Sequence, residues 1–412
     1  MSEHQTTSQG EAEELILRLG EAFAHCGMPS HRLEDRLTSL TEYLQLEGSF
    51  FAVPTSLLVD LGTGTRHRVR LARIRPSKID LGKLEALHGL ADAILAGEQD
   101  PSSATNRVRE IMTAEKRYGA GVRWLGTLIA SCAATRFMGG GVDEMLLGTL
   151  AGAMLGTLSL ILGWREGWGK MIEPLGAMLV AFVTVVGSGL FEAVDADKAL
   201  LGGLIVLVPG FTIAIAVREL VSGHTAAGTI RMASALMTTL MLGFGVAFGY
   251  RLGVLVAGEP GAAVIEPLPL WSAWALLPIA ALNIALVFEV HPRELFSVVL
   301  TACMGYLALT SAAEPMGREL AVFVAAFTVG IVGNLLARLR SRPFGVARLP
   351  ALLFLVPGGL GFLSIKRLFG GEAVDAMASA GQVGLVATAL VTGLMVADSV
   401  MTAKRAGPNE AV

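Results

Sequence analysis

From Val122 onward, apolar residues form long runs that are separated by short polar gaps. Each run is about long enough to cross a hydrocarbon core of roughly 30 Å as a helix. The pattern predicts ten membrane-spanning helices, at residues 122–138, 142–162, 171–191, 200–217, 230–250, 270–289, 295–312, 319–337, 349–369 and 379–401. We therefore expect an α-helical polytopic membrane protein.

Residues 1–118 have the polar and charged pattern of a soluble domain. The helical spacing of Leu15, Leu19 and Phe23 predicts a first helix, and a second helix is predicted from Ser30, with Ser30 as its N-cap. The segments FFAVPTSLLVDLG and HRVRLARI have the composition of strands, and further helices are predicted at about 80–97 and 101–117. We expect a small α/β domain before the membrane part.

The composition supports this division. Hydrophobic residues make up 53% of the 412 positions and charged residues only 16%, whereas soluble domains carry about 25% charged residues. The net charge of −3 argues against nucleic acid as a partner. The three cysteines are far apart in the sequence and show no metal-ligand spacing. Because no GxxxxGK[ST] phosphate loop is present either, we expect no metal, no cofactor and no ATP-driven pump.

The loop charges predict an orientation. When the loops are taken alternately, one set holds fourteen Lys and Arg residues and the other holds six. The set richer in positive charge is expected to be cytoplasmic, which places both termini and the 1–118 domain inside. The N-terminal segment MSEHQTTSQGEAEE is acidic and lacks the features of a signal peptide.

Two segments repeat each other. LIVLVPGFTIAIAVREL at 204–220 and LLFLVPGGLGFLSIKRL at 352–368 share LVPG, and a basic residue follows at the same distance in both. Pro209 and Pro357 are 148 positions apart, as are Arg218 and Lys366. We predict two five-helix units, 119–257 and 258–412. Because five is odd, the units would cross the membrane in opposite directions, as in transporters built from inverted repeats.

The Pro-Gly pairs predict interrupted helices. Proline removes a backbone N–H and glycine permits non-helical geometry, so backbone polar groups are freed. In lipid such groups must be satisfied by protein or water, which places the interruption at a cavity. We predict that Pro209, Gly210, Pro357 and Gly358 border the substrate site near the bilayer midplane. The alternative is a plain proline kink at each position.

Polar side chains inside predicted spans are further candidates, because they are costly in lipid. For substrate binding they are Thr212, Asn283 and Asn334. Asp398 is the candidate for proton coupling, since a partly buried carboxylate can bind and release a proton; alternatively it is a solvated or paired residue near the cytoplasmic end.

Two arginines follow the first Pro-Gly span. Arg218 and Arg231 could bind a substrate carboxylate at the cytoplasmic mouth, or could simply be cytoplasmic anchors. We predict no catalytic residues, because no nucleophile and base are identifiable by spacing.

The series of motifs resembles the threonine/serine exporter family over about residues 14–400. The matching segments are GMPSHRLEDRL, FFAVPTSLL, FMGGGVDEMLLG, LVPGFTIAIAVRELVSGHTAAGTIR and VGNLLARLRSRPFGVARLPALLFLVPG. The residues that match the two Pro-Gly motifs are Pro209, Gly210, Arg218, Gly228 and Arg231, then Gly333, Asn334, Pro343, Pro357 and Gly358. GGLG at 358–361 replaces GFTI of the first copy, so the two half-sites differ chemically.

The resemblance implies proton-coupled secondary export of a small carboxylate-bearing metabolite, threonine or serine, across a bacterial inner membrane. Family relatives that are split into two subunits resemble succinate exporters, so a dicarboxylate is an alternative substrate. From other functional classes, the sequence also allows a passive channel, and a membrane-tethered enzyme or sensor whose activity lies in residues 1–118. The expected partners are the substrate, protons and the lipid bilayer; a homo-oligomer is left open.

Overall fold

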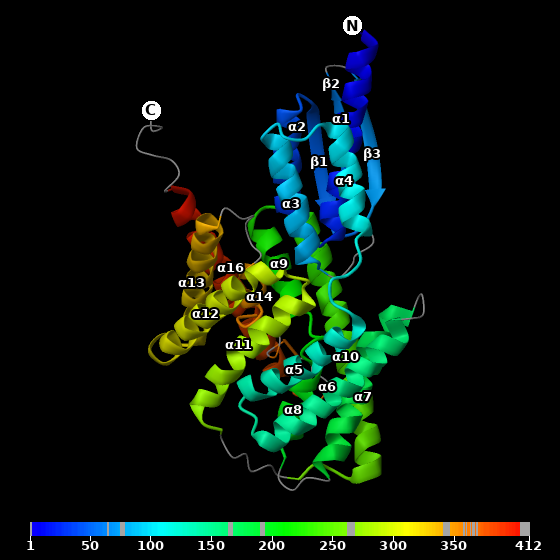
Figure 1. Ribbon diagram of the computed structural model, residues 1–412. Coiled ribbons are helices and arrows are strands. Elements are labelled where there is room, and N and C mark those ends of the chain that lie inside the picture. Colours follow the sequence, from blue (N-terminus) through cyan, green and yellow to red (C-terminus); the bar gives the residue numbers. More distant parts are fainter. Residues whose placement is uncertain are drawn as a thin grey trace.

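The computed structural model describes residues 2–63, 66–74, 79–163, 168–189, 194–261, 268–340, 347–356, 359, 361–362, 364, 367 and 370–403. It has two parts (Figure 1): a compact N-terminal domain with the only strands of the described chain, and a bundle of helices beneath it. Pro343, Pro357, Gly358 and Lys366 lie outside the described residues.

The N-terminal domain combines four helices with a three-stranded antiparallel sheet of order β1-β2-β3. Its elements are α1 (Ser2–His25), α2 (Ser30–Tyr43), β1 (Glu47–Val53), β2 (Ser56–Thr63), β3 (Arg66–Arg73), α3 (Leu81–Leu95) and α4 (Pro101–Thr113). Both helix and sheet are present as expected, and the strands form hairpins. Leu15, Leu19 and Phe23 of α1 are fully buried in its core, as is Leu57 of β2.

Two details of the sequence prediction for this domain were wrong. FFAVPTSLLVDLG forms two paired strands, β1 and β2, with a turn at Pro54 and Thr55. Proline cannot donate to a strand ladder, so the chain reverses there. Ser30 is also not the N-cap of α2, because the cap position is Pro29 and no side chain of the domain itself caps the helix.

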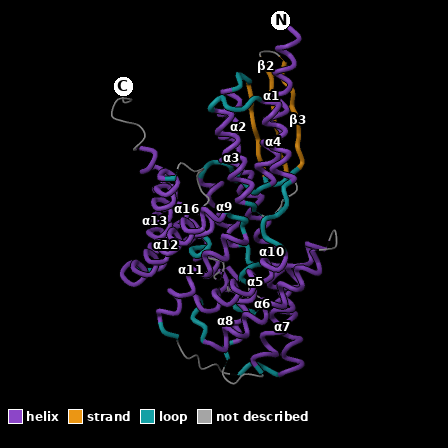
Figure 2. The backbone as a smooth tube through the Cα atoms, in the orientation of Figure 1, coloured by secondary structure: helices purple, strands orange, loops and turns teal. Residues whose placement is uncertain are grey.

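The described part of the bundle is built from helices joined by loops and turns (Figure 2). They are α5 (Ala120–Phe137), α6 (Val142–Gly163), α7 (Ile172–Ser188), α8 (Ala196–Leu204), α9 (Gly210–Val221), α10 (Thr225–Ala257), α11 (Leu270–Val287), α12 (Leu295–Met316), α13 (Arg318–Leu339), α14 (Arg348–Leu352) and α16 (Ala373–Ala403). Short 3-10 turns occupy Trp168–Met171 and Pro292–Glu294.

Six segments of the described chain are long and apolar enough to cross a membrane: Val142–Gly163, Thr225–Ala257, Leu270–Val287, Pro292–Met316, Arg318–Leu339 and Ala373–Met401. Ile172–Ser188 is a shorter apolar helix. The chain is therefore a mostly helical, multi-pass membrane protein.

The segment predicted as one span at 200–217 is an interrupted helix. α8 ends at Leu204, a turn follows, and α9 begins at Gly210 with Pro209 at its N-cap position. The turn is closed by the N–H of Ile205 donating to Gly202 O at 3.3 Å and by the N–H of Leu207 donating to Leu204 O at 2.8 Å. The Pro-Gly pair thus stands where the helix restarts, because glycine and proline both disfavour continuation of the helix across this point.

The N-terminal domain packs on the end of α11 and on the turn that follows it. The backbone N–H of Leu81 in α3 donates to Phe288 O at 2.9 Å, and the N–H of Tyr118 donates to Glu289 Oε2 at 3.2 Å. Ala285 and Val290 belong to the same buried apolar cluster as the core of the domain. The domain and the bundle therefore share one continuous core at this contact.

Candidate functional site: an arginine cluster around Asp398

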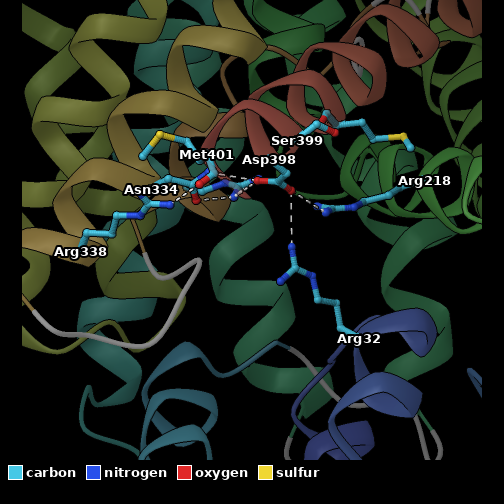
Figure 3. A network of polar contacts seen from close by, with 9 residues as sticks. Arg32, Arg218, Asn334, Arg338, Asp398, Ser399 and Met401 are labelled. Carbon is cyan, nitrogen blue, oxygen red and sulfur yellow. Dashed lines mark hydrogen bonds and ion pairs between the residues drawn. The ribbon is translucent and has the colours of Figure 1, made fainter. Parts of the chain in front are cut away.

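Asp398 lies near the C-terminal end of α16, on the side of the bundle that faces the N-terminal domain (Figure 3). Its carboxylate accepts from both terminal nitrogens of Arg348: Nη1 is 2.7 Å from Oδ1 and Nη2 is 3.3 Å from Oδ2. Arg348 is the first residue of α14 and its side chain is only 3% exposed. A two-point guanidinium–carboxylate contact at a buried position is both strong and specific in direction.

Two more guanidinium groups approach the same carboxylate oxygen. Arg218 of α9 places Nη2 3.2 Å from Asp398 Oδ2, and Arg32 of α2 places Nη2 3.5 Å from it. The three guanidinium groups and one carboxylate carry two more positive than negative charges. Burial, followed by the nearby charges of Arg218 and Arg348, lowers the pKa of Arg32 to about 10, so this side chain is still cationic at neutral pH.

Asn334 of α13 links Asp398 to Arg348. Its Nδ2 donates to Asp398 Oδ1 at 3.1 Å, and its Oδ1 accepts from Arg348 Nη1 at 2.9 Å. The neighbouring Gly333 is needed for close approach: a Cβ at this position would lie 2.2 Å from Arg348 Cγ. Arg338, one turn further along α13, donates to the backbone oxygen of Met401 and ties α13 to the end of α16. Asn334 and Gly333 of α13 therefore position the side chain of Arg348.

A second cluster lies beside the first and centres on Glu219 of α9, whose side chain is fully buried. Its Oε2 accepts from Arg231 Nε of α10 at 2.9 Å. Its Oε1 accepts from the backbone N–H of Ser30, the first residue of α2, at 2.9 Å. Glu219 therefore supplies the cap that α2 lacks within its own domain, and the positive end of the helix dipole faces this carboxylate.

Two histidines complete the contact between α2 and the bundle. His224, at the N-cap position of α10, places Nε2 3.1 Å from Glu34 Oε2. The ring of His31 lies 5.9 Å from that of His224, and neither ring nitrogen of His31 has a hydrogen-bond partner among the described residues. Burial, then the charges of Arg218 and Arg32, lowers the pKa of His31 to about 3. His31 is consequently neutral at physiological pH.

The structure brings together three of the residues that the sequence singled out. Arg218, Asn334 and Asp398 form one network, and Arg231 lies in the adjacent cluster. Pro209, Gly210 and Thr212 are at the start of α9, about 12 Å along that helix from Arg218 at 1.5 Å per residue. These three residues therefore lie at the opposite end of α9 from the cluster.

Asn283 lies outside this network. It is buried between α11 and α5, where its Nδ2 donates to Gly126 O at 2.9 Å. It satisfies a backbone carbonyl where the two helices pack closely.

Sequence reasoning missed Arg348 and Arg32. The sequence pattern marks Arg348 only as one of the positive charges of a cytoplasmic loop, and Arg32 only as part of the helix of a soluble domain. The signal for Arg348 is its place two residues before Pro350, close to the second LVPG segment. Nothing in the sequence pairs Arg32 with a residue more than 360 positions away.

The turns after α5 and α11 are closed by the same type of hydrogen bond, which also ends other helices of the chain, for example α1 at Met28 and Phe23. After α5, the N–H of Gly140 donates to Thr135 O at 3.0 Å; after α11, the N–H of Val290 donates to Ala285 O at 2.9 Å, a bond displaced by 150 positions. The residue before each donor has a positive φ, 82° at Gly139 and 59° at Glu289. The two connections are therefore built alike.

The corresponding turns of the interrupted segments match as well. The N–H of Leu353 donates to Pro350 O at 3.3 Å and that of Leu355 to Leu352 O at 2.9 Å, as in the bonds of Ile205 and Leu207 described above. The displacement here is 148 positions. The turn after α14 therefore has the same two hydrogen bonds as the turn between α8 and α9, and the second Pro-Gly pair lies outside the described residues.

The turns that follow α5 and α11 lie at opposite ends of α11. The turn after α11 meets the N-terminal domain through Phe288. Arg136, in the last turn of α5, instead donates to Leu268 O at 3.3 Å and to Pro269 O at 3.1 Å, just before α11 begins. An 18-residue helix is about 27 Å long. The turns after α5 and α11 are thus separated by the length of a membrane-spanning helix.

The chemistry of the arginine cluster is that of anion binding. Guanidinium groups match carboxylates in geometry and stay charged. Among the described residues no group of His, Cys, Asp and Glu could hold a metal ion. The cluster can make charge-assisted hydrogen bonds where α9, α14 and α16 meet the N-terminal domain.

Comparison with known proteins identifies the family. A family model described as "Putative threonine/serine exporter" (ThrE) matches residues 14–253, and a second, described as "Threonine/Serine exporter, ThrE", matches residues 273–400. Both exporter models therefore occur in one chain, in a fused arrangement. No solved structure matches the chain.

Curated relatives are yeast membrane proteins. "Pheromone-regulated membrane protein 10" of Eremothecium gossypii is 26% identical over 84% of this chain and 48% of its own length. The proteins of the same name from Kluyveromyces lactis and Yarrowia lipolytica are 25% and 26% identical over 85% of this chain, and the matches cover 38% and 30% of those proteins. The chain thus spans about half the length of these relatives or less. With the first exporter model covering more than half of its residues, the chain belongs to the threonine/serine exporter family.

Proposed function

We propose that the protein is a secondary exporter of a small carboxylate-bearing metabolite, threonine or serine, driven by exchange with protons. The observation that carries the proposal is the cluster of Arg32, Arg218 and Arg348 around Asp398. It lies where α9, α14 and α16 meet the N-terminal domain. Intramembrane or membrane-edge charges of this kind are typical of substrate and proton pathways.

In this proposal, Asp398 holds the arginines while no substrate is bound. A substrate carboxylate would take over contacts with Arg218 and Arg348, which can bind a carboxylate as they bind Asp398. Protonation of Asp398 would remove its charge and release the guanidinium groups to the substrate. Proton binding and substrate binding are then linked at one residue, so each affects the affinity for the other.

The ten-span, inverted-repeat architecture is part of the proposal. The six long apolar helices, together with α5, α7, the α8–α9 pair and the segment beginning with α14, correspond to the ten predicted spans. We base two inverted five-helix units, 119–257 and 258–412, on the LVPG segments displaced by 148 positions and on the location of the turns after α5 and α11 at opposite ends of α11. Pro209-Gly210 and Pro357-Gly358 would then face each other at the substrate pathway.

The orientation rests on charge. The predicted loops that lie on the same side as residues 1–118 in the ten-span topology are those with more Lys and Arg, so we place this domain and both termini in the cytoplasm. The relatives named above are yeast proteins, so the expectation of a bacterial inner membrane rests on the family resemblance.

A dicarboxylate such as succinate is the second candidate substrate, and the charge of the cluster favours it. Three guanidinium groups face one carboxylate, whereas a zwitterionic amino acid also needs an acceptor for its ammonium group. Glu219, the buried acid of the adjacent cluster, already accepts from Arg231 and from Ser30 N. A second carboxylate would use the excess positive charge directly.

A ligand-binding activity of the N-terminal domain is a third candidate. A cavity of about 430 Å³ lies between α1, α4 and the end of β3, lined by Arg18, Arg73, Arg109 and Met112 among others. This cavity could admit a small anion, which would make the domain a sensor. We place transport first, because the family models cover both the domain and the bundle; for the same reason we infer that the protein is not an enzyme.

Efflux from proteoliposomes tests the proposal. Purified protein is reconstituted with labelled threonine, serine or succinate inside, and loss of label is followed after a pH gradient is imposed. We expect efflux of one substrate class to accelerate with the gradient and to slow when a protonophore collapses it. A flux that is the same with and without the pH gradient would indicate a passive channel.

A further inference from the structure

We propose that the N-terminal domain is part of the transport site: Arg32 contacts the substrate carboxylate, and the first turns of α2 form the cytoplasmic gate. This inference rests on the proposed function and deepens it, because it assigns a role to a domain that the motifs leave without one. It also predicts that transport requires α2 to move relative to the bundle.

Three contacts join a short stretch of α2 to three different helices of the bundle. Ser30 N–H donates to Glu219 at the end of α9, Arg32 pairs with Asp398 on α16, and Glu34 pairs with His224 at the start of α10. All three come from five consecutive positions of α2. A domain attached to the bundle only through its linker would not be expected to contact three helices through one helix end.

The exposure of the three arginines forms a gradient from solvent to interior. The side chain of Arg32 is 32% exposed, that of Arg218 is 20% exposed and that of Arg348 is 3% exposed. All three place Nη2 within 3.5 Å of the same oxygen, Asp398 Oδ2. An anion that enters from the side of the N-terminal domain therefore meets Arg32 first and can pass to Arg218 and Arg348 without losing guanidinium contact.

The same contacts close the path. Glu219 is fully buried beneath the N-terminus of α2 and bridges it to Arg231. The ring of His31 is 8% exposed and fills the space beside His224. With α2 in this position, the N-terminal domain covers part of the arginine cluster, and Arg348 is only 3% exposed. In this proposal, a solute of the size of an amino acid reaches Arg348 only after α2 shifts.

Arg36 provides a matched control on the same helix. It lies one turn beyond Arg32, but its guanidinium group donates to His88 O at 3.2 Å and pairs with Asp92, both within the N-terminal domain. Removal of Arg36 therefore removes one arginine from α2 without removing a contact to the bundle.

The first experiment compares Arg32→Ala, Arg32→Lys and Arg36→Ala with the unaltered protein in proteoliposomes. Efflux rates are measured against the internal substrate concentration, which separates KM from kcat. We expect Arg32→Ala to raise KM at least tenfold, Arg32→Lys to raise it less, and Arg36→Ala to leave it within twofold. A KM within twofold for Arg32→Ala would overturn the role of Arg32.

The second experiment tests the gate. Cysteines replace Glu34 and His224 in a background in which Cys26, Cys132 and Cys303 are changed to Ser, and a short bis-methanethiosulfonate reagent joins them. We expect transport by the double-cysteine variant to stop on crosslinking and to return with reductant, while each single-cysteine variant has the same rate with and without the reagent. Undiminished transport by the crosslinked protein, or failure of the pair to crosslink, would contradict the gate.

The two proposals fail in distinguishable ways. If the unaltered protein moves none of the test substrates, the proposed function fails. If it transports and neither Arg32→Ala nor the crosslink changes that transport, only the inference about the N-terminal domain fails.

Discussion

Arg348 and Asp398 face each other in a two-point contact, with Nη1 2.7 Å from Oδ1 and Nη2 3.3 Å from Oδ2. They lie at the beginning of α14 and near the end of α16, so the contact joins the interrupted segment of the second half to the last helix. The arginine is almost fully buried, whereas the carboxylate is 24% exposed. Asp398 is therefore the partner that water and protons can reach.

Replacing Arg348 should be the most damaging single change at the cluster. Removing one partner of a fully buried ion pair costs about 3–5 kcal/mol; the cost here is smaller, because Asp398 is 24% exposed and still pairs with Arg218 and Arg32. We expect Arg348→Ala to lower thermal stability measurably and to reduce efflux more than tenfold. Arg348→Lys should recover stability better than transport, because a single ammonium group cannot make the two-point contact.

Arg107→Ala is the control for this comparison. Its side chain is 63% exposed and pairs with Glu110 on the surface of α4, where such pairs contribute about 0–1 kcal/mol. If Arg348→Ala has the same efflux rate as the wild-type protein, at equal amounts of folded protein, Arg348 is not part of the transport site.

Asp398→Asn should separate proton coupling from substrate movement. The amide keeps the shape of the carboxylate and can still accept from Arg348, but it cannot exchange a proton at working pH. We expect gradient-driven efflux to be lost while exchange of labelled for unlabelled substrate continues. Efflux of the variant that still follows the imposed pH gradient would show that protons couple elsewhere.

Gly333→Ala should displace Arg348 without removing any charge. The added methyl group would lie 2.2 Å from Arg348 Cγ, so the arginine must move away from Asp398. Gly384→Ala in α16 is the matched control, since no atom lies within 4 Å of a Cβ there. We expect the first variant to lose most transport and the second to keep it. Equal efflux by both would mean that the position of Arg348 is unimportant.

The burial of His31 predicts a pH-dependent stability. Its pKa is lowered from 6.5 to about 3 in the folded protein, so the unfolded state binds the proton more readily. The contribution of His31 to the free energy of unfolding is complete above about pH 6.5 and declines as the pH falls toward 3. We expect the Tm of the wild-type protein to drop between pH 7.5 and 5, and His31→Gln to show a smaller drop.

His88 allows the contribution of His31 to be isolated. Its pKa is also lowered by burial, to about 4, and it stays in both proteins. The difference between the two Tm curves therefore reports His31 alone. Curves that run parallel over this pH range would contradict a neutral, buried His31.

The sequence predicted the features that depend on neighbouring residues. The hydrophobic runs located the long helices, and the LVPG repeat located an interruption that the structure shows between Leu204 and Gly210. Helical spacing also identified Leu15, Leu19 and Phe23 as core residues. These signals are local, because period and helix-breaking chemistry act within a few positions.

The sequence could not predict which charges meet. Arg32, Arg218, Arg348 and Asp398 lie on four different helices, and positive charges at membrane edges are more simply explained as anchors. The cap of α2 by Glu219 was missed for the same reason, since the capping residue comes from another part of the chain. Tertiary contacts of this kind depend on how helices pack, which no local pattern encodes.

Counterflow tests the central claim most directly. Proteoliposomes are preloaded with unlabelled threonine, serine or succinate, diluted into traces of the same labelled compound, and sampled with and without a pH gradient. We predict transient accumulation of label for one substrate class, and its loss in Arg348→Ala. No accumulation for any of these compounds by a correctly folded, reconstituted protein would contradict the account of the cluster as a carboxylate transport site.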